Sequence, residues 1–201
     1  MININRVKIC VKTNEKEFGL DEVFDKKIVF VTSSDNTQGK SSFIEAIYYC
    51  LGLEELIGGK NEQALKPVFR SKLEYEGKEY FVLESEFMLQ IKNQSDEVIT
   101  LRRFGKREGK GSNLITVYYS DIDNIFNAQT KSEDMYVHLA GSATNKKGFH
   151  RFLEEFLGFK LPYVSCYDDS ERKLYLQIIF SAFLLNKKEG GQICLLLYLH
   201  T

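Results

Sequence analysis

The sequence lacks the residues that mark several common classes of protein. Its 201 residues include no tryptophan, two prolines and three histidines. The four cysteines, Cys10, Cys50, Cys166 and Cys194, form no C-x-x-C pair and no metal-binding spacing with the histidines. Buried free thiols in a reducing compartment are therefore the expected state.

Long apolar runs and an excess of one charge are also missing. No apolar run reaches the ~20 residues that span a membrane, and the start, MININRVKIC, lacks a signal-peptide core. These absences favour a cytoplasmic protein. The formal net charge is −1, so no overall positive field steers the chain to nucleic acid. The length suits one domain with a sizeable core, or two small lobes.

The most informative stretch runs from 28 to 51, IVFVTSSDNTQGKSSFIEAIYYCL. Its apolar opening, Ile28–Val31, predicts a buried strand. A polar loop, 32–38, leads into a helix with an apolar stripe that includes Phe43 and Ile47, and Gly52 is its predicted stop. Strand, polar loop, Gly-Lys-Ser and helix together are typical of a phosphate-binding P-loop.

The chemistry of a P-loop assigns a role to each part of this segment. Unpaired amides and the helix dipole attract phosphate, and Gly39 lets the backbone approach it. Lys40 is expected to reach the β- and γ-phosphates, and the Ser41 hydroxyl to coordinate Mg²⁺. Ser34 replaces the usual first glycine at a cost of about 1 kcal/mol. The predicted ATP-binding residues are Ser34, Asp35, Asn36, Thr37, Gln38, Gly39, Lys40, Ser41 and Ser42.

β-Strands are predicted on both sides of this segment. Residues 1–13 alternate as a strand, and the charged residues 14–27 are predicted to connect it, as a hairpin, to the strand at Ile28. Residues 52–66 are predicted to form a loop with a short helix near 62–65. Residues 71–104 are typical of an antiparallel meander of about three or four strands.

A basic cluster follows the meander, and two interpretations of it remain open. Its members are Arg102, Arg103, Lys106, Arg107 and Lys110. The first interpretation is a solvated, flexible hairpin tip. The second is a DNA-backbone contact, because glycine-rich basic loops can follow phosphates.

The last third of the chain is predicted to hold a strand, a helix and an apolar core segment. Residues 115–119 predict a strand, with Asp121 just after it. Residues 142–157 predict an amphipathic helix. The run 173–185, KLYLQIIFSAFLL, predicts a core strand, with a helix as the alternative.

The P-loop segment resembles the N-terminal half of an SMC-type ABC ATPase head, as in SbcC-like and RecF-like ATPases. The resemblance is closest to the SMC-like subunits of Lamassu-type anti-phage systems. It implies an α/β P-loop NTPase half-head, with a mixed sheet, a central P-loop helix and an antiparallel β-rich lobe. It also implies ATP and Mg²⁺, and a role in DNA repair, DNA tethering or anti-phage defence. The positions that match the family pattern are Asn36, Gly39, Lys40, Ser41, Ser42, Glu45 and Ala46.

The resemblance further implies that hydrolysis needs a C-terminal half and a second head. By this reading, residues 1–201 are a single domain that stops where a coiled coil would begin. A Q-loop glutamine is expected after the apolar run, but residues 186–191 contain none before Gln192. Gln177 lies inside the run and is interpreted as a packed or edge residue.

Two other functions remain open from the sequence. One is a self-sufficient P-loop NTPase or kinase in which Asp121 holds Mg²⁺ through water, although an aspartate at a strand end is commonly a cap. The other is a non-enzymatic remnant or interaction module that no longer binds nucleotide. Ser34 and the missing Q-loop glutamine favour that last alternative.

Overall fold

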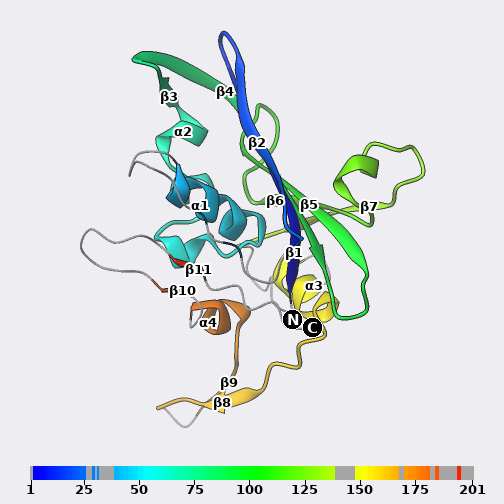
Figure 1. Ribbon diagram of the computed structural model, residues 1–201. Coiled ribbons are helices and arrows are strands. Elements are labelled where there is room, and N and C mark those ends of the chain that lie inside the picture. Colours follow the sequence, from blue (N-terminus) through cyan, green and yellow to red (C-terminus); the bar gives the residue numbers. More distant parts are fainter. Residues whose placement is uncertain are drawn as a thin grey trace.

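A computed structural model describes residues 2–25, 29, 31, 39–138, 148–167, 170–181, 184–185 and 194–195. These residues form a mixed α/β fold with a mostly antiparallel sheet and few helices (Figure 1). No helix among them is long and apolar enough to cross a membrane.

One large sheet organises the fold. Its strand order is β2-β1-β4-β5-β6-β7, with β3 paired to β4, and every pairing between these strands is antiparallel. The strands are β1 (Asn3–Thr13), β2 (Glu17–Val23), β3 (Lys72–Tyr75), β4 (Lys78–Lys92), β5 (Val98–Lys106), β6 (Leu114–Tyr118) and β7 (Ser132–Tyr136). Two short pairs lie outside it, β8 (Tyr163–Ser165) with β9 (Glu171–Lys173) and β10 (Leu184–Leu185) with β11 (Cys194–Leu195).

The helices are short. The α-helices are α1 (Lys40–Cys50), α2 (Pro67–Arg70), α3 (Phe149–Phe156) and α4 (Leu176–Ser181). The 3₁₀ turns are η1 (Glu54–Ile57), η2 (Asn61–Ala64) and η3 (Ile122–Asn124).

The two faces of the sheet are covered differently. Successive side chains of a strand point to opposite faces, so Phe87 and Leu89 of β4 share one face and Met88 the other. Phe87, which is fully buried, makes edge contacts with Tyr49 of α1 and Phe69 of α2. This face therefore carries the main core. Met88 packs in a separate small cluster with Ile122 and Ile125.

Several sequence predictions are confirmed. Residues 1–13 contain β1, residues 71–104 contain the antiparallel meander β3-β4-β5, and residues 115–119 overlap β6. Helix α1 begins at Lys40, and Gly52 follows its C-cap with a φ of +67°. The meander has three strands because Tyr80 to Ile91 lie in one long strand.

The strand predicted over Ile28–Val31 is wrong at its two described residues. Val29 and Val31 lie outside any strand and are 41% and 37% exposed. The strand beside β1 is instead the charged segment Glu17–Val23, in which Phe18 and Leu20 pack against the core between exposed acidic residues. Alternation of half-buried apolar and exposed polar residues is typical of a strand at the edge of a sheet. A continuous apolar run such as Ile28–Val31 does not specify which strand it pairs with.

The core strand predicted over 173–185 is wrong at the centre of that run. The described centre is helix α4, in which Leu176 and Phe180 are buried and Ile178 is exposed. The four-residue spacing of the buried pair places both side chains on one helix face. The helical alternative is therefore confirmed for Leu176–Ser181.

Candidate functional site

Helix α1 begins at the Gly-Lys-Ser segment that the sequence predicts as a phosphate-binding turn. Gly39 is its N-cap, with a left-handed φ of +77°, and its carbonyl accepts the Phe43 amide at 2.9 Å. Within the described part of the chain, no side chain caps the first turn, and the turn contains no acidic residue. Anion binding by the amides of this turn stays a prediction.

The predicted ATP-binding residues divide into two groups. Gly39 is exposed, and Lys40, Ser41 and Ser42 are half-buried at the start of α1. Their roles in binding phosphate and Mg²⁺ stay predictions. Ser34, Asp35, Asn36, Thr37 and Gln38 lie outside the described residues, so their roles stay predictions.

Asp121 lies in the loop after β6 and caps a 3₁₀ turn. It is the N-cap of η3, and its Oδ1 accepts the Asn124 amide at 3.0 Å. The next residue, Ile122, packs with Met88 on the face opposite α1. Asp121 thus serves as a cap, and the cap interpretation is confirmed.

The expected Q-loop segment, 186–191, and Gln192 lie outside the described residues. Gln177 is described and lies in α4, not in a strand. Its side-chain amide donates a hydrogen bond to Glu55 Oε2 at 3.2 Å. Gln177 is thus a packed residue, but in a helix.

A buried ion pair lies at the other end of α1, and the sequence analysis missed it. Arg103 of β5 and Glu54 of η1 are both 0% exposed, and the guanidinium binds both carboxylate oxygens, at 2.6 and 3.0 Å. Arg103 also donates to the Tyr49 carbonyl at 2.5 Å and lies 3.8 Å from the centroid of the Tyr49 ring. This pair joins the sheet to the end of α1.

Two histidines extend this ionic network. His138 donates to Glu54 Oε1 at 2.8 Å, and His150 of α3 donates to the Gly52 carbonyl at 2.7 Å. Burial opposes ionisation of Glu54, but hydrogen bonds from His138 and Arg103 outweigh it and lower its pKa to about 2. Burial lowers the pKa of His150. We name Arg103, Glu54, His138 and His150 the buried ionic network.

The prediction that Arg103 contacts DNA is therefore wrong, because its side chain is fully buried. The alternation of Ile99, Leu101 and Arg103 along β5 places all three on the core face, and that period was a signal available in the sequence. Arg102 is 18% exposed and pairs with Glu86. Both arginines lie within β5, so the flexible-tip interpretation is also wrong for them.

Lys106, Arg107 and Lys110 are the exposed members of the basic cluster. Lys106 is exposed and donates to the Val82 carbonyl at 2.6 Å. Arg107 is 38% exposed, pairs with Glu84 at 3.3 Å and lies 4.4 Å from the Phe104 ring centroid. A DNA contact through Lys106 and Arg107 stays a prediction.

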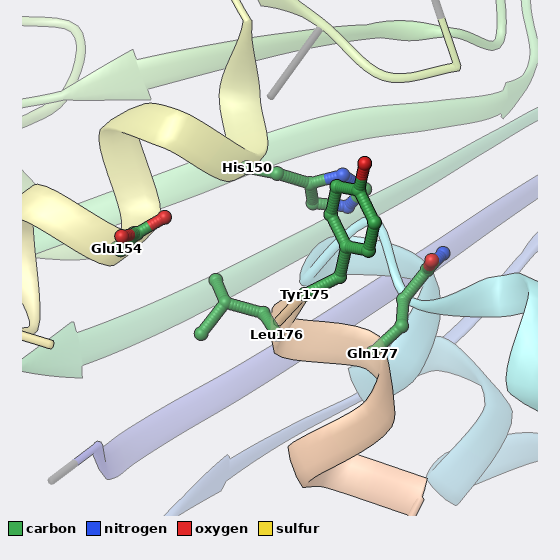
Figure 2. Close-up of a pocket in the computed structure, with 5 residues that line it drawn as sticks. All are labelled: His150, Glu154, Tyr175, Leu176 and Gln177. Atoms are coloured by element: carbon green, nitrogen blue, oxygen red, sulfur yellow. The ribbon is translucent and has the colours of Figure 1, made fainter. Parts of the chain in front are cut away.

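A small pocket lies beside the buried ionic network. Figure 2 shows His150 and Glu154 projecting from α3, with Tyr175, Leu176 and Gln177 at the start of α4. Its cavity volume of about 20 Å³ has room for roughly one water molecule. Glu154 pairs with Lys173 at 2.7 Å. The pocket is too small for a nucleotide.

Comparison of the chain with family models, with curated proteins and with solved structures finds no match.

Proposed function

We propose that this chain is the ATP-binding N-terminal lobe of an SMC-like ATPase, acting in DNA repair, DNA tethering or anti-phage defence. Hydrolysis then requires a C-terminal half and a second head. The observation that carries the proposal is the left-handed Gly39 followed directly by Lys40 and Ser41 in the first turn of α1. The finer fold assignment, a P-loop half-head with α1 at its centre, is part of the proposal.

Three features of this arrangement support phosphate binding. Uncapped amides and the helix dipole favour an anion at this end of α1. The lysine directly after the glycine supplies a full positive charge, and the next residue supplies a hydroxyl for Mg²⁺. The sheet supports the helix rigidly, since Phe43 to Cys50 are all buried.

Thermal melting with Mg·ATP tests the proposal on residues 1–201. At 100 times its Kd, a bound nucleotide adds about 2.7 kcal/mol to the free energy of unfolding. Lys40→Ala should abolish most of that shift. Lys60→Ala is the matched control, because Lys60 also follows glycine but is 68% exposed and starts no α-helix.

Two results would count against the proposal. An unaltered chain that melts at the same temperature with and without Mg·ATP favours the non-enzymatic interaction module. Steady ATP turnover by residues 1–201, abolished by Lys40→Ala, contradicts the half-head and favours a self-sufficient enzyme. The N-cap role of Asp121 in η3 supports the half-head over that enzyme.

A DNA contact is a subordinate part of the proposal. It rests on Lys106 and Arg107, two of the three exposed cations of the basic cluster. Replacement of both by alanine should weaken binding of duplex DNA and flatten its salt dependence. Unchanged affinity in the double variant would remove DNA from the proposal.

A further inference from the structure

Three aromatic rings surround one ammonium group where two hairpins meet. Lys16, in the turn between β1 and β2, places its Nζ 4.8 Å from the ring centroid of Phe18, 4.6 Å from that of Tyr75 and 5.0 Å from that of Tyr80. The rings meet edge to face, with the Phe18 centroid 5.5 Å from Tyr75 and 5.1 Å from Tyr80. We name Phe18, Tyr75 and Tyr80 the aromatic cage.

The cage is anchored independently of the Lys16 side chain. The Lys16 carbonyl accepts bonds from the Thr13 amide and hydroxyl, and its amide donates to Thr13 Oγ1 at 3.2 Å. Between the hairpins, Asn14 exchanges backbone and side-chain hydrogen bonds with Phe81. The turn therefore holds its position by backbone bonds, and the Lys16 side chain is free to rotate away.

The cage is also reachable from solvent. Lys16 is exposed, Tyr75 is 46% exposed and Phe18 is half-buried, whereas Tyr80 forms a buried floor. In Figure 1 the β3–β4 hairpin, which carries Tyr75 and Tyr80, projects away from the helices. A ligand cation thus has access once the lysine moves.

The ammonium group of Lys16 in the cage indicates that the cage binds cations. A cation over several ring faces is held by the ring quadrupoles. A primary ammonium has three N–H donors and is strongly hydrated, and ring faces are poor substitutes for water as acceptors. A quaternary ammonium has the same charge and no N–H group, so it loses no hydrogen bonds on entry. It therefore fits the cage better than Lys16 does.

We propose that the aromatic cage is a binding site for a quaternary ammonium group, which Lys16 occupies in the absence of ligand. The group is either a free solute such as choline or the side chain of a trimethylated lysine in a partner chain. Lys16 acts as a tethered competitor, which weakens binding of either. The site is independent of the nucleotide site proposed at α1.

Titration of choline into the Lys16→Ala variant tests the site, with Tyr ring signals followed by NMR. We expect saturable binding at least ten-fold tighter than in the unaltered chain. The control ligand is 3,3-dimethylbutanol, which has the shape of choline without the charge and should not bind. A trimethyllysine peptide that binds more tightly than choline identifies a partner chain as the source, and equal affinity identifies a free solute.

Two further variants keep the test specific. Tyr75→Leu in the Lys16→Ala background removes an exposed wall of the cage and should weaken choline binding at least ten-fold. Tyr163→Leu is the matched control, because Tyr163 is 67% exposed and lies in β8, far from β3 in Figure 1. A folded Lys16→Ala variant that binds no choline, or binds the neutral alcohol equally well, overturns the proposal.

Discussion

The two ends of α1 differ in how their backbone groups are satisfied. At the C-terminal end, the Gly52 amide bonds to the Tyr49 carbonyl and the Leu53 amide to the Tyr48 carbonyl, which closes a Schellman motif. Arg103 adds a further bond to the Tyr49 carbonyl. At the N-terminal end, no side chain among the described residues caps the first turn. The chain thus fixes the C-terminal end by its own contacts, whereas the N-terminal end is the proposed site of ligand binding.

The largest expected effect comes from the buried ion pair. Glu54→Ala leaves the Arg103 charge fully buried without its partner, which costs about 3–5 kcal/mol of unfolding free energy. The control is Glu79→Ala, which breaks an exposed pair with Lys72 and should cost about 1 kcal/mol or less. Urea denaturation measures both.

A double variant separates charge from packing in this result. Arg103→Met with Glu54→Leu removes both charges and should be more stable than Glu54→Ala alone. If Glu54→Ala costs no more than Glu79→Ala, the network does not fix the C-terminal end of α1.

Acid should weaken the same end of the helix. The pKa of Glu54 falls from its ordinary 4.5 to about 2 on folding, so its contribution is complete above pH 4.5 and is lost as the pH falls toward 2. The difference corresponds to about 3 kcal/mol. The lowered pKa of His150 acts in the same direction, because burial disfavours the protonated imidazole. Unfolding free energies between pH 7 and pH 2 test this.

The Arg103→Met, Glu54→Leu double variant is the control for the acid experiment. It lacks the carboxylate, so its stability should fall less between pH 4.5 and pH 2. An identical acid loss in both proteins would assign the effect to other groups.

The next effect is expected at Gly52. Its φ of +67° disfavours any residue with a Cβ, and a Cβ there would lie 2.7 Å from Val137 Cγ1 and 3.1 Å from His150 Nε2. We expect Gly52→Ala to cost about 2 kcal/mol, from backbone strain and from the displaced side chains together. Thermal and urea unfolding provide the measurement. A cost of about 1 kcal/mol or less would mean that the side chains of Val137 and His150 move aside with little loss of stability.

Sequence reasoning was most successful where periodicity and turn residues agreed. The alternation along β1 and the turns between β3, β4 and β5 predicted strands and an antiparallel meander that the structure contains, and α1 followed from an apolar stripe that ends at Gly52. Continuous apolar runs carried no such information. The run over Ile28–Val31 did not indicate whether it would pair in the sheet, and the run 173–185 fits both a strand and a helix.

The site was predictable only in part, for a related reason. Gly39 and Lys40 begin a helix as the motif requires, because the motif is local in sequence. The pairing of Arg103 with Glu54 joins residues 49 positions apart, and no local pattern specifies the partner. The basic cluster was interpreted by composition, whereas the alternation along β5 determines which of its arginines is buried.

The smallest expected effect on stability is at Gly39, and it sharpens the contrast between the two ends of α1. Its φ of +77° gives Gly39→Ala a strain cost of about 1 kcal/mol, but no atom of the described residues lies within 4 Å of the added Cβ. Gly77→Ala is the matched control, because Gly77 has a φ of +74° and equally open surroundings in the β3–β4 turn. Both variants should melt alike without ligand. Only Gly39→Ala should lose stabilisation by Mg·ATP, because only there does the backbone conformation align the amides of α1. Equal shifts of the melting temperature by Mg·ATP in the two variants would show that the left-handed conformation of Gly39 shapes the turn but does not contribute to nucleotide binding.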